Sequence, residues 1–227
     1  MSPDATGLTR DAFLGGRVSV WQPAHGYRAG LDAVLLAAAC AARPGDRVLE
    51  LGCGVGTAAL CVAARVPELT LAGVEQDGQA AGLARRNAAA AGVALEVRTG
   101  DIAALPPDLR ARVFDHVILN PPYFDRAASR PSDHAAREAA MGEATPLDTW
   151  LSVAARRLAP KGWMTLIHRA ERLPDVLAGL GTLGSVEIRP LAPRAGRPAR
   201  LILLRARKGG RAPLALLPPL VMHEGPA

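Results

Sequence analysis

From residue 47 onward, short runs rich in Val, Ile and Leu alternate along the chain with Ala-rich stretches of helical length. Few folds accept this alternation, because each helix must carry the chain back to the end of the sheet where the next strand begins. The strand runs are apolar on both faces, which is typical of a mostly parallel sheet covered by helices on each side. The expected strands are 47–51, 70–75, 93–99, 113–120 and 162–168, and the expected helices are 57–65, 79–91, 146–158 and 172–183.

Two further strand-like runs close the pattern, at 185–191 and 199–206. No helix separates them, so we expect an antiparallel pair at one edge of the sheet. The whole pattern predicts an α/β, Rossmann-like fold with a seven-stranded, mostly parallel sheet.

The first 45 residues differ from the rest of the chain. They hold a β-rich run at 15–23 and a helical run at 32–42. We interpret residues 1–45 as a hairpin and a cap helix that belong to the same domain as the α/β unit of residues 46–227. One long segment, 124–144, is polar and lacks apolar periodicity, and loops of such length are usually functional or mobile.

The composition excludes several classes of protein. No uninterrupted apolar run approaches the roughly 20 residues of a membrane helix, and the N-terminal residues lack the apolar stretch of a secretory signal. The three cysteines, Cys40, Cys53 and Cys61, show no CxxC spacing and have no histidine cluster beside them. We therefore expect reduced thiols, no metal site and a cytoplasmic location; a monomer is favoured.

A glycine-rich run, ELGCGVG, lies directly between the first expected strand of the sheet and the helix that follows it. Gly52, Gly54 and Gly56 would let the backbone turn sharply and approach a ligand closely. Dinucleotide-binding enzymes place a similar run at the same point. Here Glu50 precedes the first glycine, and an acid there suits a cationic cofactor better than a pyrophosphate. The alternative interpretation is a tight turn without a ligand.

Two more acids follow the next two strands. Glu75 ends the second strand, some 20 residues beyond the glycine run, where an acid can accept hydrogen bonds from both hydroxyls of a ribose. Asp101 follows the third strand and is placed to accept from an exocyclic adenine amine, with Ile102 packing on the ring. The structural alternatives are a solvated loop acid for Glu75 and a helix N-cap for Asp101.

The sequence Asn-Pro-Pro-Tyr, residues 120–123, ends the fourth strand. Two prolines cannot continue a strand ladder, so Pro121 and Pro122 should force the chain out in an extended turn. That turn would expose the Asn120 side-chain oxygen and the Pro121 carbonyl, two acceptors that match the two hydrogens of a planar amino group. Tyr123 would supply a face on which a flipped base can stack. The motif indicates methylation of an amino nitrogen.

Charge is distributed unevenly along the chain. Residues 1–150 carry a net charge of −3, whereas residues 151–227 carry +9. The range 189–211 contains eight basic residues and no acid, which suits a polyanion such as RNA. Within it we select Arg194, Arg197 and Lys208 as candidate RNA-binding residues. A general preference for arginine over lysine would explain the same composition without RNA.

Together these motifs resemble the class I, Rossmann-like methyltransferases that use S-adenosylmethionine (SAM). Flanking motifs resemble those of the bacterial tRNA-Val adenine-N6 methyltransferases, namely LGGR at 14–17, QP at 22–23, GYRAGLDAVLL at 26–36, HR at 168–169 and RKGG at 207–210.

The resemblance implies a role for each motif residue. The glycine run with Glu50 would contact the amino-acid end of SAM, Glu75 its ribose and Asp101 with Ile102 its adenine. Asp32 matches a position near the cofactor, although it is also an ordinary first-turn acid of a helix. Asn120, at the edge of the cofactor site, would hold the target amine together with Pro121, Pro122 and Tyr123. The implied substrate is the adenine next to the anticodon of tRNA-Val.

Other targets remain open. Glutamine side-chain amide methyltransferases that act on proteins share Asn-Pro-Pro-Tyr, because an amide also presents an NH2 group. Methylation of the guanine N2 amine in rRNA is a variant of the RNA interpretation. A cofactor-binding protein without catalysis is the third possibility, and the intact Asn120 is evidence against it.

Overall fold

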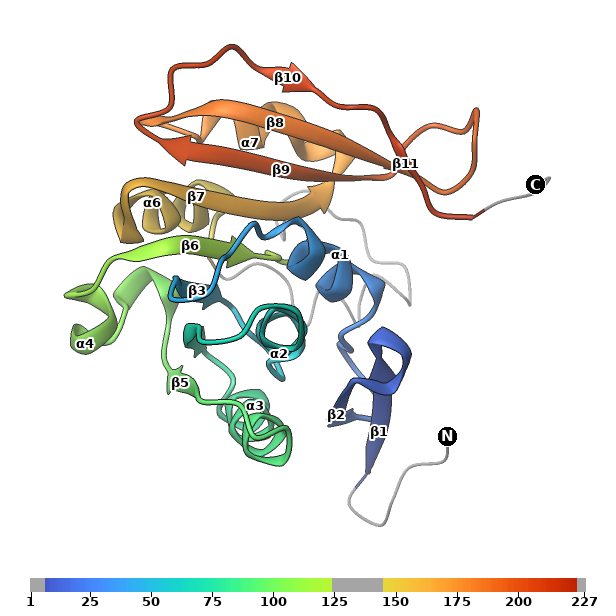
Figure 1. Cartoon of the computed structure of the whole chain (residues 1–227), viewed down its shortest axis with the longest axis vertical. Helices are drawn as coiled ribbons and strands as arrows, with labels where there is room; N and C mark the ends of the chain where they lie inside the picture. The colour runs from blue at the N-terminus through green and yellow to red at the C-terminus, as the bar shows by residue number, and fades with distance from the viewer. Residues whose placement is uncertain (1–6, 124–144, 224–227) are drawn as a thin grey trace.

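The computed structural model describes residues 7–123 and 145–223, and its centre is a twisted sheet with helices on both faces (Figure 1). The strands lie in the order β10-β8-β9-β7-β6-β3-β4-β5, with β11 also paired to β8. The bounds of the strands are β3 Arg47–Leu51, β4 Thr70–Glu75, β5 Leu95–Thr99, β6 Phe114–Leu119, β7 Leu158–Arg169, β8 Leu183–Ala192, β9 Leu201–Lys208, β10 Ala215–Leu216 and β11 Leu220–Val221.

The five strands β5, β4, β3, β6 and β7 run parallel, so their carboxyl ends meet at one edge of the sheet. Strand β9 inserts antiparallel between β7 and β8, and its arrow points the opposite way in Figure 1. The antiparallel pair is confirmed. The count of seven strands is too low for the described residues, because the short strands β10 and β11 of the C-terminal segment pair parallel with the outer side of β8.

Helices cover each face of the sheet in accordance with the alternation of side chains along the strands. One face packs against α1 (Leu31–Ala39), α2 (Thr57–Arg65) and α3 (Gly78–Ala90). The other packs against α4 (Pro107–Arg110), α6 (Leu147–Arg157) and α7 (Leu173–Ala178). Short 3₁₀ turns lie at Leu14–Gly16, Ile102–Ala104 and Ala170–Arg172.

Helix α7 is shorter than the pattern predicts. The sequence pattern predicts a helix over 172–183, whereas α7 ends at Ala178. Gly179 follows directly, and Gly181 has a φ of +56°, a left-handed conformation that favours glycine and ends a helix. The chain therefore turns early into β8, which begins two residues sooner than expected.

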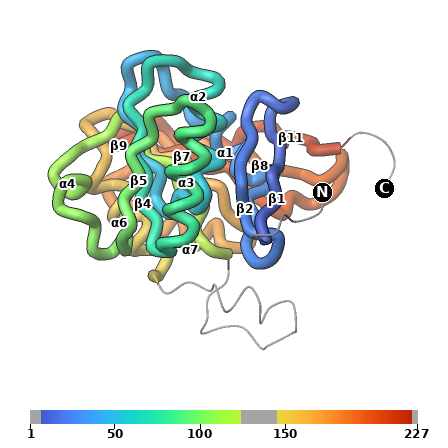
Figure 2. Tube along the Cα trace, turned by 90° about the horizontal axis from the view of Figure 1, so that it is seen from below, coloured from blue at the N-terminus to red at the C-terminus, as the bar shows by residue number. Residues whose placement is uncertain are grey.

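The N-terminal hairpin forms a two-stranded sheet of its own, with β1 (Leu8–Phe13) antiparallel to β2 (Val18–Pro23). It lies beside α3, as Figure 2 shows. The buried Asn87 of α3 fastens it, because its side chain accepts from the Trp21 backbone N–H at 2.8 Å and donates to the Trp21 carbonyl at 3.0 Å. The guanidinium of Arg86 also stacks over the Trp21 ring, 4.5 Å from its centroid.

Further expectations concern membrane spans, metal sites, thiols and the long loop. No helix among residues 7–123 and 145–223 is long and apolar enough to cross a membrane. In the same residues no three His, Cys, Asp or Glu side chains gather as a metal site, and all three cysteines are free and buried. The long loop expected at 124–144 lies outside the described residues.

Candidate active site

The glycine-rich run forms a tight loop at the carboxyl end of β3. Gly52, Gly54 and Gly56 have φ values of +64°, +53° and +85°, which residues other than glycine rarely adopt. A Cβ on Gly52 would also lie 2.5 Å from the Trp150 ring of α6. The loop closes where the Gly56 N–H donates to the Cys53 carbonyl at 2.8 Å. Its backbone N–H groups are thus held close to the start of α2.

Glu50 lies beneath this loop and is only 5% exposed. One carboxylate oxygen accepts from the Ala59 N–H of α2 at 2.9 Å. Burial raises the pKa of Glu50 to about 8, and the nearby carboxylate of Glu75 adds to the shift. A buried acid with a raised pKa favours a cationic partner, since a positive charge would restore the ionised form.

Glu75, at the end of β4, braces the loop. Its two carboxylate oxygens accept from the Gly54 N–H at 2.8 Å and from the Asp77 N–H at 2.9 Å. Each oxygen of a carboxylate can accept more than one hydrogen bond, so the expected contacts with two ribose hydroxyls remain available. The carboxylate is thus bonded to the backbone on both sides, and its contact with a ribose stays a prediction.

Asp101 acts as the N-cap of the 3₁₀ turn after β5, because its Oδ1 accepts from the Ala103 N–H at 2.8 Å. The structural alternative raised from the sequence is thus present, and the second carboxylate oxygen has no partner among the described residues. Ile102 is buried in the core cluster beneath α6. Contact of both residues with adenine stays a prediction.

Asn120 follows β6 and presents its side chain on the same face of the sheet as Glu50, toward α1. Its amide nitrogen donates to the Tyr27 hydroxyl at 3.4 Å. Its oxygen, Oδ1, is buried and has no hydrogen-bond partner in the described part of the chain. Buried acceptors are rarely left unpaired in folded proteins, so an orphan of this kind suggests a missing ligand.

The Tyr123 side chain is held on two sides. Its hydroxyl donates to Oδ2 of Asp32, in the first turn of α1, at 2.5 Å. Burial and this acceptor raise the pKa of Tyr123, so the hydroxyl stays protonated. The ring packs at a tilt against His168 of β7, with 5.4 Å between centroids, and the Arg169 guanidinium lies 5.9 Å from the ring.

His168 is fully buried and neutral. Its Nδ1 accepts from the Arg169 N–H at 2.8 Å, so the ring proton is on Nε2. Burial lowers its pKa to about 4, and the nearby Arg172 and Arg169 charges contribute. A neutral imidazole supports the Tyr123 ring without adding charge next to the target site.

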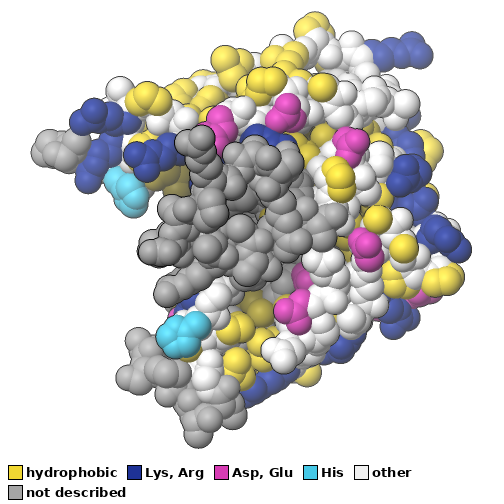
Figure 3. Space-filling model, turned by 180° about the vertical axis from the view of Figure 1, so that it is seen from behind, with side chains coloured by type: hydrophobic (Ala, Val, Ile, Leu, Met, Phe, Trp, Pro, Cys, Tyr) yellow, Lys and Arg dark blue, Asp and Glu magenta, His cyan; other side chains and the backbone are white. Residues whose placement is uncertain are grey.

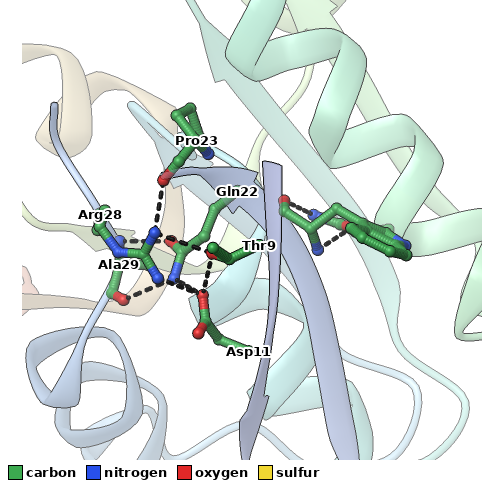
Figure 4. Close-up of polar contacts among 8 residues, drawn as sticks. Thr9, Asp11, Gln22, Pro23, Arg28 and Ala29 are labelled. Atoms are coloured by element: carbon green, nitrogen blue, oxygen red, sulfur yellow. Dashed lines mark hydrogen bonds and ion pairs between the residues drawn. The ribbon is translucent and has the colours of Figure 1, made fainter. Parts of the chain in front are cut away.

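Tyr27 is a site residue that the sequence reasoning missed. It lies in the link between the hairpin and α1, and Figure 4 shows how that link is held. Gln22 exchanges hydrogen bonds with the Ala29 backbone and donates to Asp11 at 2.7 Å. Arg28 donates to Asp11 and to the Pro23 carbonyl. The resemblance pointed to this segment as a motif but assigned Tyr27 no contact.

These elements enclose a small pocket between residues 27–36, the glycine loop, the start of α2 and Asn120. Thr57 and Asn120 line the pocket, and the Oγ1 of Thr57, like Oδ1 of Asn120, is buried without a partner in the described residues. The two unpaired polar atoms, the buried acid Glu50 and the close backbone of the glycine loop match the chemistry of SAM. The residues present therefore fit this cofactor.

The candidate RNA-binding residues do not lie together. Arg194 and Arg197 belong to the β8–β9 loop at the carboxyl edge, where the site lies. Lys208 is at the far end of β9, and its ammonium donates to the Leu158 carbonyl at 2.7 Å. Lys208 lies apart from Arg194 and Arg197, because antiparallel β9 carries the chain back to the amino edge. Contact of these three residues with RNA stays a prediction.

Strand order, glycine loop and site together define a class I, Rossmann-like methyltransferase. The sequence model of the methyltransferase small domain family matches residues 29–187. The chain belongs to this family and, like its members, is a SAM-dependent methyltransferase.

Several curated relatives share a single name. A tRNA1(Val) (adenine(37)-N6)-methyltransferase of Porphyromonas gingivalis is 33% identical over 177 residues, which cover 74% of this chain and 69% of the relative. One of the same name from Dickeya chrysanthemi is 32% identical, covering 82% of this chain and 74% of the relative.

Solved structures agree on the fold. A predicted O-methyltransferase from Agrobacterium tumefaciens is 30% identical with a TM-score of 0.69, covering 86% of this chain and 89% of that one. The 16S rRNA N2 G1207 methyltransferase of T. thermophilus, solved with AdoMet and guanosine, is 21% identical with a TM-score of 0.62, covering 88% of this chain and 50% of that one.

Proposed function

We propose that the protein transfers a methyl group from SAM to the exocyclic N6 amine of an adenine in tRNA, next to the anticodon of a valine tRNA. The observation that carries the proposal is the buried, unpaired Oδ1 of Asn120 at the mouth of the cofactor pocket. The names of the curated relatives support tRNA as the substrate. A tRNA substrate agrees with a cytoplasmic location.

The chemistry needs alignment more than a strong base. Bound SAM supplies an electrophilic methyl group on a sulfonium. Asn120 Oδ1 and the Pro121 carbonyl accept the two hydrogens of the amine, which draws electron density onto nitrogen and aims its lone pair at the methyl. The N–C bond forms as the S–C bond breaks, and the nitrogen then gives one proton to solvent.

Tyr27 selects the orientation of the Asn120 amide. Because the Tyr27 hydroxyl takes the NH2 end, the oxygen end points at the substrate. Tyr123, fixed by Asp32 and His168, provides a ring for the target base to stack on. An anticodon-loop base is already single-stranded, so its entry into such a site costs little unstacking.

The test is to incubate the protein with methyl-labelled SAM and total tRNA, then identify the modified nucleoside by mass spectrometry. We expect N6-methyladenosine, formed by the wild type and reduced at least a hundredfold in Asn120→Ala, whose affinity for SAM should be unchanged within about threefold. N2-methylguanosine or a methylated glutamine in added protein would replace the proposal with the corresponding alternative. Label in RNA from Asn120→Ala at more than a few per cent of the wild-type rate would refute the role of Asn120.

A further inference from the structure

The basic residues of the C-terminal part separate into two groups with different surroundings. In the middle of β9, Arg205 pairs with Glu187 at 3.1 Å and stacks on Trp163. The next two basic residues lie at the end of β9, at the amino edge of the sheet. Arg207 donates to the Lys161 carbonyl at 3.0 Å, and Lys208 is bonded to Leu158. These side chains support the fold, and their charges are directed at the protein itself.

The second group lies in the β8–β9 loop at the carboxyl edge. Arg194, Arg197 and Arg200 line a concave surface together with Pro193 and Pro198. Arg197 and Arg200 are exposed, and in the described residues neither side chain has a hydrogen bond or ion pair. In Figure 3, Lys and Arg side chains gather at the end of the molecule where this loop and the C-terminal segment lie, at the upper left.

Backbone hydrogen bonds fix the β8–β9 loop to the rest of the fold. Its turn is closed by the Arg197 N–H, which donates to the Arg194 carbonyl at 3.2 Å around Gly196, whose φ is +72°. The C-terminal segment fastens its base, because the Met222 and His223 N–H groups donate to the carbonyls of residues 192 and 193. The backbone positions of the three arginines are therefore fixed near one another, so that binding does not have to order the loop.

The loop is also tied to the target site. The Ala170 N–H donates to the Arg200 carbonyl at 2.9 Å, directly after His168 and Arg169. Arg169 in turn lies over the Tyr123 ring. Positive side chains thus follow one another along the carboxyl edge, from Arg169 beside the Tyr123 ring, on which the target base would stack, to the β8–β9 loop.

We propose that this loop holds the phosphate backbone of the substrate RNA on the β8 side of the target base, an inference that rests on the proposed function. Arg194, Arg197 and Arg200 each contact a phosphate of the nucleotides next to the extruded base, and Arg169 bridges to the base itself. The β9 residues Arg205, Arg207 and Lys208 take no part. RNA fits because guanidinium groups pair with phosphates in a fixed geometry.

The test compares two triple variants of equal charge change. Arg194→Gln, Arg197→Gln and Arg200→Gln together remove the loop charges. Arg43→Gln, Arg110→Gln and Arg211→Gln together remove three exposed charges at the amino edge. Binding of an unmodified valine tRNA transcript is measured from 50 to 300 mM salt, with SAM affinity as the check of folding.

Each lost phosphate contact flattens the plot of log Kd against log salt by about 0.7, so the loop variant should lose about 2 in slope. Its Kd should rise at least tenfold at 150 mM salt, while the amino-edge variant stays within about threefold of the wild type. Equal losses in both variants would show that only net charge matters, and an unchanged slope in the loop variant would place the RNA elsewhere. Both outcomes overturn the inference while wild-type methylation of tRNA persists. If the wild type methylates no RNA at all, the proposed function itself fails.

Discussion

The Tyr123 hydroxyl lies 2.5 Å from Oδ2 of Asp32, so that a residue of the target site is bonded to the first turn of a helix 91 positions earlier in the chain. This contact suggests a role for Asp32 as the hydrogen-bond partner of Tyr123, which the sequence alone does not indicate. As a partner of Tyr123, Asp32 would orient the ring on which the substrate base stacks. As a cofactor ligand, the role implied by the resemblance, it would act on SAM affinity instead.

A double-mutant cycle separates these roles. If Asp32 positions Tyr123, Asp32→Ala and Tyr123→Phe should each lower kcat/KM for RNA about tenfold or more, because a hydrogen bond to a charged group contributes about 1.5–3 kcal/mol. The double variant should be no worse than either single one, since both remove the same bond. Asp148→Ala, in the first turn of α6, is the control and should change nothing. A clear rise in the Kd for SAM in Asp32→Ala, with Tyr123→Phe unaffected, would assign Asp32 to the cofactor.

Tyr27→Phe tests the orientation of the Asn120 amide. Without the hydroxyl, the amide can rotate and present its NH2 end to the target amine. We expect kcat to fall about three- to tenfold in single-turnover assays, with KM for RNA and affinity for SAM nearly constant. An unchanged kcat would show that the 3.4 Å contact does not hold the amide.

Glu75→Ala should weaken SAM binding at least tenfold in calorimetry. The substitution removes the carboxylate, and with it the expected hydrogen bonds to the ribose and those from the Gly54 and Asp77 N–H groups. Each of these bonds contributes about 1 kcal/mol or more. Glu68→Ala removes an exposed acid from the turn before β4 and should leave the Kd unchanged. Equal affinities in the wild type and Glu75→Ala would remove Glu75 from the site.

We expect Glu50 to make SAM binding depend on pH. Its pKa in the free protein is raised to about 8, so near pH 7 the carboxyl is mostly protonated. A cationic ligand favours the carboxylate and lowers that pKa, so binding should release a proton and tighten as pH rises toward 8. Titrations at pH 7 in buffers of different ionisation enthalpy should detect up to one proton released, and none in Glu50→Gln. Proton release that is the same in Glu50→Gln would assign it to another group.

Local patterns predicted the centre of the fold well. Strands β3 and β4 and helix α2 occupy the expected residues, because apolar runs and glycine turns are local signals. The strands β10 and β11 were missed because two-residue strands leave no periodic pattern. Their pairing depends on the long path of the C-terminal segment beside β8.

In the site, too, local motifs predict what lies close in sequence, whereas contacts between distant residues depend on the fold. Motifs identified Glu50, Glu75 and Asn120, which the fold brings to one edge of the sheet. Tyr27 was missed because its partner lies 93 positions away and no spacing rule relates them. Lys208 was grouped with Arg194 by closeness in sequence, although the antiparallel direction of β9 puts them at opposite ends of the sheet.

We propose that the protein methylates the exocyclic amine of one adenine next to the anticodon. The most direct measurement compares single-turnover methylation of two valine tRNA transcripts that differ only at that position, with adenine in one and guanine in the other. We expect labelled methyl to enter the adenine transcript, to be recovered as N6-methyladenosine, and not to enter the guanine transcript. Equal incorporation into both transcripts, or label in another nucleoside, would contradict this proposal.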